Sequence, residues 1–224
     1  MKHKAFTEII AEHSGVPQKT VALYVRNLKE AGLLTSGARG VNAPDMTVLD
    51  LTRMIIALCA TDRPSEAVEM VENYLMAQCN GPSSGSFVVG ERQIDVPEGT
   101  TVEEFLTSML SLHWAYLLFS DLEIRIFEKR FRVEIEIFGS SLWFFVPKTE
   151  LQEQAKKQGG IITTRGISPE AIRQMALPFF IERSDGSLWE DVISEGRAPE
   201  TVSKYVFQDP KSVFDRTEAN GETE

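Results

Sequence analysis

The chain has few of the side chains from which most catalytic and metal sites are built. Its 224 residues include two cysteines and three histidines. The histidines, His3, His13 and His113, are dispersed, so packing or surface roles are favoured over catalysis. The sequence contains no Gly-rich phosphate loop, Gly-x-Ser-x-Gly nucleophile motif or His-Glu-x-x-His zinc motif. We therefore expect no enzymatic activity, no catalytic residue, no metal site and no cofactor.

Long apolar runs are also missing. No stretch of about 18 consecutive apolar residues occurs, as a membrane-spanning helix requires, and the N-terminus lacks the apolar region of a signal peptide. These absences predict a cytoplasmic protein with no membrane partner. Cys59 and Cys79 lie on apolar stretches with no His or Cys at metal-ligand spacing. Buried reduced thiols are therefore favoured over a disulfide or a metal site.

An overall excess of positive charge is missing as well, since the formal net charge is -10. This value at first argues against nucleic acid, because Lys and Arg contacts with phosphates supply most of the affinity. The distribution changes that interpretation. Residues 1–40 hold six basic and three acidic side chains, so the remaining 184 residues carry a net charge of -13. The pattern fits a basic binding region on an acidic body.

Two short amphipathic helices are predicted within residues 4–31. Apolar residues recur at helical spacing from about Lys4 to His13, and Gly15 then ends the first helix. Pro17 suits the first position of a second helix that reaches about Ala31. The inward side of that second helix is expected to consist of Val21, Tyr24, Val25 and Leu28.

The small Ala11, the Gly15 turn and the β-branched Val21 have a spacing that resembles the helix-turn-helix of bacterial and phage DNA-binding proteins. The following Ala31-Gly32-Leu33-Leu34 segment and the glycine-flanked Arg39 resemble the winged-helix subclass. The run of Gly32-Leu33-Leu34, then Gly37-Ala38-Arg39-Gly40, then Ala43-Pro44 is also similar to that of uncharacterised prophage-encoded proteins. In this chain, residues 37–44 have little strand character, so they fit a basic loop as well as a hairpin. An ordinary helical hairpin is the alternative interpretation of residues 4–31.

A helix-turn-helix implies a set of DNA-contacting side chains on the outward side of the second helix. Gln18 has the groups to pair with adenine, and Lys19 or Arg26 has the reach for guanine edges or phosphates. Thr20 suits a phosphate at the helix N-terminus, while Arg39 suits insertion into a narrow minor groove. Arg26 has an alternative role as the i,i+4 ion-pair partner of Glu30. The predicted DNA-binding residues are Gln18, Lys19, Thr20, Ala22, Arg26, Lys29 and Arg39.

The rest of the chain predicts an α+β protein with four parts: a (winged) helix-turn-helix head at 1–46, a helical pair at 47–80, an α+β body at 87–181, and an acidic, partly disordered tail at 182–224. The first helix of the pair is apolar over most of its circumference, so the head, the body or a second copy must cover it. The 47–80 segment is therefore a candidate for dimerisation.

Alternating apolar residues in the body predict an antiparallel sheet packed on a helix at 101–119. The expected strands are 87–89 and 93–96 around a Gly90-Glu91 turn, followed by runs near 122–126, 131–137 and 142–146. A polar helix is expected at 148–160, and a last helix begins at Ser168 and ends before Pro178. Glu134 and Glu136 share one sheet face, which suits either an acid–base pair or an ion-pair lattice with Arg125, Arg130 and Arg132. The lattice is favoured.

These features predict a sequence-specific DNA-binding protein, specifically a prokaryotic or phage transcriptional regulator that binds double-stranded DNA as a dimer. One alternative is a DNA-packaging factor that resembles phage small terminase subunits, which pair a helix-turn-helix with an oligomerising body. Another is an acidic interaction or inhibitor module whose body and tail bind a protein partner.

Overall fold

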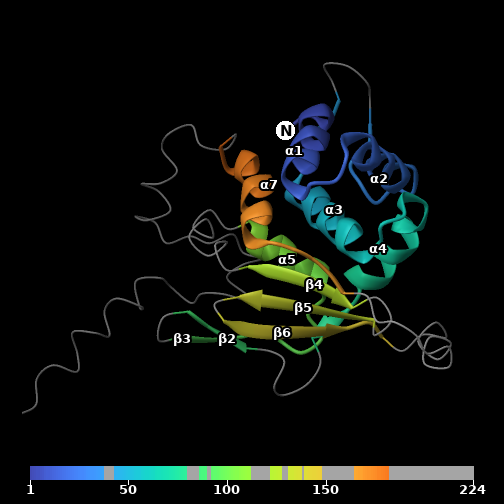
Figure 1. Cartoon of the computed structure of the whole chain (residues 1–224). Helices are drawn as coiled ribbons and strands as arrows, with labels where there is room; N and C mark the ends of the chain where they lie inside the picture. The colour runs from blue at the N-terminus through green and yellow to red at the C-terminus, as the bar shows by residue number, and fades with distance from the viewer. Residues whose placement is uncertain are drawn as a thin grey trace, which may run out of the picture.

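A layer of helices packs on one face of an antiparallel sheet (Figure 1). The computed structural model describes residues 1–37, 43–79, 86–89, 92–111, 122–127, 131–137, 139–147 and 164–181. Within these residues the predicted α+β class is confirmed. The predicted 148–160 helix, the end of the 101–119 helix beyond residue 111 and the 182–224 tail lie outside the described residues.

The two predicted N-terminal helices are α1 (His3–Ser14) and α2 (Gln18–Glu30). Gly15 stands at the end of α1 with a φ of 71°, a left-handed conformation that costs glycine little. The chain then turns within three residues and enters α2. The four predicted inward residues of α2 are all buried: Val21, Tyr24, Val25 and Leu28.

Helix α3 (Val48–Ala60) lies at the centre of the fold (Figure 1). It begins with a capping box, in which the Thr47 hydroxyl accepts from the Asp50 backbone N–H and the Asp50 carboxylate accepts from the Thr47 N–H. Most of its residues are buried, as its apolar circumference requires. It contacts helices α2, α4 (Ala67–Leu75), α5 (Val102–Ser111) and α7 (Pro169–Ile181) and strands β4 (Glu123–Phe127) and β7 (Thr164–Ile167). Other elements of the same chain therefore cover most of α3, whose apolar circumference left open whether the head, the body or a second copy covers it.

Helix α4 (Ala67–Leu75) completes the predicted helical pair after a short 3-10 turn at Pro64–Glu66. The chain then enters β1 (Gln78–Cys79), a two-residue edge strand that the sequence pattern did not predict. The predicted hairpin forms β2 (Ser86–Val89) and β3 (Arg92–Asp95), which pair antiparallel.

The main sheet has five antiparallel strands in the order β1-β6-β5-β4-β7. The predicted meander is confirmed as β4 (Glu123–Phe127), β5 (Arg132–Ile137) and β6 (Ser140–Phe145). Strand β7 (Thr164–Ile167), which was not predicted, pairs with β4. Alternate residues of β4, β5 and β6 are buried toward the helices, among them α5 (Val102–Ser111).

Helix α7 (Pro169–Ile181) corrects the prediction that the last helix ends before Pro178. A proline inside a helix removes one backbone hydrogen bond and crowds the preceding turn. Packing compensates, because Phe179 is buried and meets Phe6 of α1 edge to face, with ring centres 6.3 Å apart. The C-terminal helix is thereby tied to the N-terminal one.

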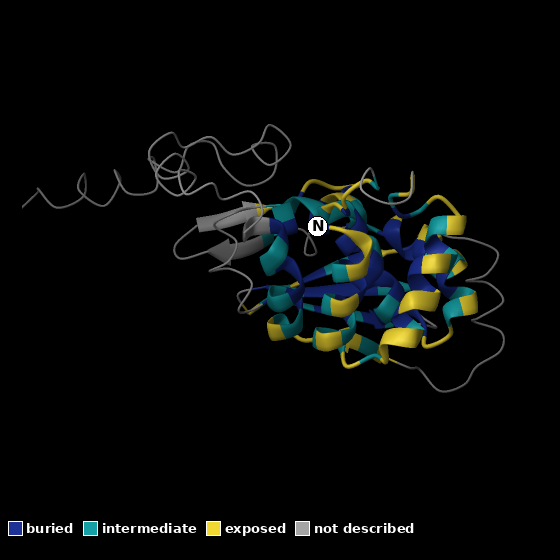
Figure 2. Cartoon of the chain, turned by 90° about the horizontal axis from the view of Figure 1, so that it is seen from above, coloured by how far each residue is buried: buried dark blue, intermediate teal, exposed yellow. Residues whose placement is uncertain are grey.

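One continuous core runs from Phe6 in α1 through α3 to the inner face of the sheet and Phe179. Figure 2 shows exposed residues on the outward sides of the helices and buried residues toward the interior. The predicted head, helical pair and body therefore share a single apolar interior. Cys59 and Cys79 are both buried and form no disulfide, as predicted.

Candidate nucleic-acid interface

The outward side of α2 holds most of the predicted DNA-binding residues. Gln18, Lys19, Ala22 and Arg26 are all exposed, while the opposite side of the helix is buried. Successive residues in a helix are offset so that positions three and four apart share a face. Lys19, Ala22 and Arg26 therefore form one outward row, and Gln18 flanks its N-terminal end.

The N-terminal end of α2 has no side-chain cap. Pro17 stands at the N-cap position and supplies no side-chain cap hydrogen bond, and the first turn contains no acidic residue. The first backbone N–H groups of a helix have no intrahelical partner and carry partial positive charge. Together with the exposed Lys19, this end of α2 is suited to a phosphate group.

Arg26 is already held by a neighbour on the same helix. Its Nε donates to Glu30 Oε1 at 2.7 Å, which is the alternative role predicted for this side chain. The hydrogen bond and the charge of Glu30 raise the pKa of Arg26. Both side chains are mostly exposed, and such pairs contribute little to stability. Arg26 can therefore exchange Glu30 for a phosphate at small cost.

The remaining predicted residues lie less favourably. Thr20 and Lys29 are half-buried rather than fully outward, which corrects the position predicted for Lys29. Burial lowers the pKa of Lys29, and the charge of Asp50 acts in the opposite direction. Arg39 lies outside the described residues. The structure thus brings Lys19, Ala22 and Arg26 together, and it places Thr20 and Lys29 at the edges of that row.

Leu23 also lies on the outward side, and the sequence analysis did not assign it a role. It is 50% exposed, one of the few large apolar side chains of the described residues left in solvent. In the sequence, Leu23 does not fall at one of the inward apolar positions of α2, and this spacing could have revealed its exposure. An exposed leucine between Lys19 and Arg26 suits contact with a thymine methyl group or with an apolar spot on a protein.

Hydrogen bonds fix α2 to the rest of the fold. The buried Tyr24 hydroxyl donates to the Thr61 carbonyl at 2.7 Å, and Asn27 Nδ2 donates to the Pro64 carbonyl at 2.6 Å. Burial and the nearby charge of Asp62 raise the pKa of Tyr24 to about 12. These bonds orient α2 before any ligand arrives, which reduces the ordering cost of binding.

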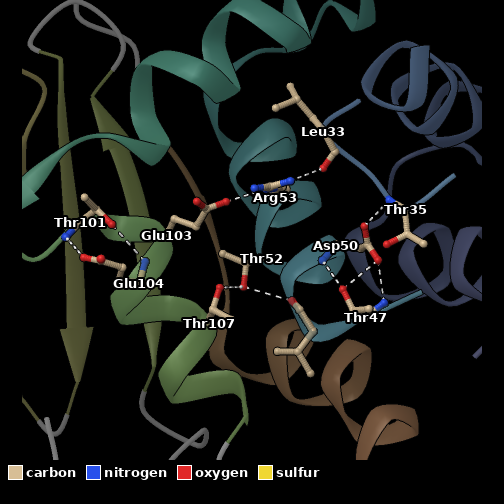
Figure 3. A network of polar contacts seen from close by, with 11 residues as sticks. Leu33, Thr35, Thr47, Asp50, Thr52, Arg53, Thr101, Glu103, Glu104 and Thr107 are labelled. Carbon is tan, nitrogen blue, oxygen red and sulfur yellow. Dashed lines mark hydrogen bonds and ion pairs between the residues drawn. The ribbon is translucent and has the colours of Figure 1, made fainter. Parts of the chain in front are cut away.

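A polar network continues beyond the end of α2 (Figure 3). Arg53 of α3 donates from Nη1 to the Leu33 carbonyl at 2.8 Å and from Nε to Glu103 at 2.5 Å, so it bridges the end of the α2 segment to α5. The Thr35 N–H donates to Asp50 Oδ1 at 2.6 Å. The backbone that follows α2 is therefore held by two charged side chains of α3.

The predicted wing falls partly outside the described residues. Residues 31–37 and 43–47 contain no strand. The ends of the intervening segment lie close together, because a Cβ on Gly37 would stand 3.0 Å from Pro44 Cδ. Lys2 Nζ donates to the Ala43 carbonyl at 2.7 Å and holds the second end to the start of α1. The described residues show a closed loop base, which accommodates either a hairpin or a loop.

The structure also shows the contacts of the arginines and glutamates that the sequence analysis considered on the sheet. Arg125 Nη1 lies 3.6 Å from Glu134, and its Nη2 lies 3.2 Å from Glu136, so the ion-pair lattice is confirmed for this arginine. Arg132 stacks on Phe127 and Trp143, and Arg130 lies outside the described residues. No metal-binding group of three or more His, Cys, Asp or Glu occurs in the part of the chain that the structure describes.

None of the described helices has the length and apolar character needed to cross a membrane. Comparisons with protein-family models, curated proteins and solved structures found no match to this chain. The functional interpretation therefore depends on the residues and their geometry.

Proposed function

We propose that the chain is a sequence-specific DNA-binding protein, a prokaryotic or phage transcriptional regulator that acts as a dimer. The observation that carries the proposal is the outward row of Lys19, Ala22 and Arg26 on α2, beside an uncapped helix N-terminus. The row belongs to the second helix of a pair joined by a three-residue turn, which is the arrangement of a helix-turn-helix.

In this proposal α2 enters the major groove of the DNA with its N-terminal end leading. Gln18 pairs with an adenine edge, and Lys19 contacts a guanine edge or a phosphate. The small Ala22 allows close approach of the helix, and Arg26 releases Glu30 to reach a phosphate. Each good bidentate base contact contributes about 1–3 kcal/mol of discrimination against the wrong base.

A dimer follows from the modest charge of the head. The six basic side chains in residues 1–40 are opposed by three acidic ones, so one copy offers few phosphate contacts. Salt dependence and affinity both rise with the number of phosphates that a protein neutralises. Two copies related by two-fold symmetry double that number and read two half-sites.

Leu23 favours a second candidate function, binding of a protein partner through the same side of α2. The half-exposed leucine resembles the apolar centre of a small protein interface, and the adjacent ion pair of Arg26 and Glu30 resembles its polar rim. In that case the acidic charge of the remaining chain attracts a basic partner.

The test is selection from a library of random DNA duplexes with the full chain, followed by mobility-shift titration of the selected duplex. We expect that Lys19→Ala and Arg26→Ala each weaken binding at least about tenfold and reduce the slope of log affinity against log salt by about one. Adding Arg39→Ala to Lys19→Ala tests the loop contact in the same assay.

Lys4→Ala is the matched control, because Lys4 is a fully exposed lysine on α1 that pairs loosely with Glu8. It removes the same charge from the same head and is expected to change affinity far less. Failure to enrich any duplex, or equal losses for Lys4→Ala and Lys19→Ala, would contradict base reading by α2. Binding as a larger ring would favour the packaging alternative.

A further inference from the structure

The outward sides of α2 and α4 carry complementary side chains at matching positions. On α4, four buried residues face the core, and the exposed residues Glu69, Glu72 and Met76 lie on the opposite side. Positions three and four apart share a helix face, so these three residues form one outward row. On α2, Lys19 and Leu23 have the same four-residue spacing as Glu72 and Met76. Each row therefore places one apolar side chain four residues after a charge, and the two charges have opposite signs.

The apolar members of the two rows are exceptional in this fold. Among the described residues, the large apolar side chains that are exposed are Leu23 at 50%, Met76 at 54% and Phe145 at 38%. Two of these three belong to the rows on α2 and α4. A single exposed apolar residue needs no explanation, but the match in charge and spacing points to a contact between the rows.

The charges of the two rows are available for that contact. In the part of the chain that the structure describes, the side chains of Lys19, Glu69 and Glu72 form no hydrogen bond or ion pair. Helices α2 and α4 contact each other within the chain (Figure 1), but both rows point away from the core. The rows therefore do not meet within one chain, and a second copy can bring them together.

We propose that α2 of one copy binds α4 of a second copy, with the two helices parallel and Leu23 packed on Met76. Lys19 then lies opposite Glu72, because both residues precede the apolar contact by four positions, about 6 Å along a helix. Glu69 falls just beyond the first residue of α2, where the helix has no side-chain cap. The free backbone N–H groups at that end favour a carboxylate. One register thus satisfies three contacts.

The antiparallel arrangement is less favourable. With Leu23 again packed on Met76, Glu30 falls opposite Glu69, because both are seven residues from the apolar contact. Like charges at such a position repel. Arg26 would approach Glu72 in this arrangement, but it already has Glu30 as its partner. The distribution of charge therefore selects the parallel contact.

The contact joins two different surfaces, so it is heterologous and leaves one unused row at each end of the pair. Further copies can add until a ring closes or a chain of copies grows. The contact also covers the row of α2 that we propose to enter DNA, so self-association and DNA binding exclude each other. It is thus separate from the dimer proposed on DNA. Only the competition with DNA rests on the proposed function.

The test is the mass of the full chain in solution without DNA, measured by sedimentation over a wide range of concentrations. One helix against one helix is a small interface, so the mass is expected to rise with concentration and to fall again with added salt. Lys19→Glu and Glu72→Lys each place like charges opposite each other. Each is expected to weaken self-association by at least about tenfold.

Combining both reversals in one chain gives the decisive result. In the double variant Lys19→Glu/Glu72→Lys, the two opposed charges again have opposite signs, so we expect self-association to return. A folding defect in the single variants cannot produce this recovery, and thermal unfolding checks that each variant is folded. The double variant also separates the two proposals, because it is expected to self-associate while DNA binding stays weakened by the loss of Lys19.

Met76→Ser removes the apolar contact and keeps every charge, so it is expected to weaken self-association and to leave DNA affinity unchanged. Lys4→Glu on α1 and Glu98→Lys before α5 are the matched reversals, at exposed positions outside both rows, and are expected to change the mass far less. A wild type that stays monomeric at every concentration, equal losses for the matched reversals, or a double variant without recovery would overturn the proposal. These outcomes are read without DNA, so a failure of the proposed function does not alter them.

Discussion

The outward side of α2 and the outer face of the sheet both carry arginines, but the two surfaces hold them differently. Arg26 has Glu30 as its ion-pair partner, and both are mostly exposed. Arg125 contacts three carboxylates, and Arg132 stacks on two rings. A helix offers same-side neighbours only three or four residues away, whereas a central strand has neighbours on both sides. Arg26 on α2 can therefore exchange its partner for another group easily, whereas Arg125 and Arg132 on the sheet are each held by several neighbours.

The largest expected effect is on the sheet. Trp143→Ala removes the ring on which Arg132 stacks and a large part of the apolar surface of the outer face. Because Trp143 is half-buried, we expect a loss of about 3 kcal/mol in the free energy of unfolding, at the low end for removal of a tryptophan. Urea unfolding measures the change. A loss below about 0.5 kcal/mol, the range of ordinary surface substitutions, would show that the stack does not hold this face.

The inner side of α2 provides the second test. The pKa of Tyr24 is raised from 10.0 to about 12, so the folded state favours the neutral phenol. This stabilisation is complete below pH 10 and is lost as the pH rises toward 12. At 1.36 kcal/mol per unit, the loss is at most about 2.7 kcal/mol. Denaturant unfolding as a function of pH measures it, and Tyr24→Phe, which lacks the titrating group, should show a flatter profile over this range.

Arg125→Ala is expected to have a smaller effect, about 1–2 kcal/mol, because it leaves three carboxylates without their shared cation and Glu134 is only 8% exposed. Glu134→Gln in the Arg125→Ala background should recover part of the loss, since it removes the charge that is most buried. A double variant no more stable than Arg125→Ala would argue that packing of the arginine stem, rather than charge, stabilises the sheet.

The smallest effects are expected on the outward side of α2. Leu23→Ala should change the free energy of unfolding by no more than about 0.5 kcal/mol, because the side chain is half in solvent and alanine favours helices. Arg26→Ala should have no measurable effect on unfolding. A clear destabilisation by either substitution would show that the side chain stabilises the fold instead of serving the binding surface. The outward side of α2 would then not differ from the sheet in this respect.

The helices and the meander were predictable from the sequence because their signals are local. Val21, Tyr24, Val25 and Leu28 follow the helical period, and residues 122–146 alternate with the period of a strand. Strands β1 and β7 escaped prediction because their pairing is with residues distant in sequence. Strand β7 contains one large apolar residue, Ile167, and its Gly166 is needed because a Cβ there would stand 2.7 Å from the Ile124 carbonyl oxygen.

The candidate site was likewise predictable from the sequence where its signals are local, but not where it depends on distant residues. The helical period places Lys19, Ala22 and Arg26 on the outward side, and the structure agrees. The half-burial of Lys29 was not predictable, because the groups near it, His3 and Asp50, come from other segments. Continuation of α7 through Pro178 likewise depends on Phe6, more than 160 residues earlier in the chain.

The central position of α3 determines how the unit that we propose to bind DNA can be inherited or engineered. Tyr24, Leu33 and Thr35 each bond to a residue of α3 or of the turn directly after it, Thr61, Arg53 and Asp50 respectively. A graft of residues 1–46 onto another protein would break all three bonds and expose the inner side of α2. The α1–α2 pair is therefore not an independent unit: recombination that preserves its structure must carry α3, and with it the sheet that α3 covers.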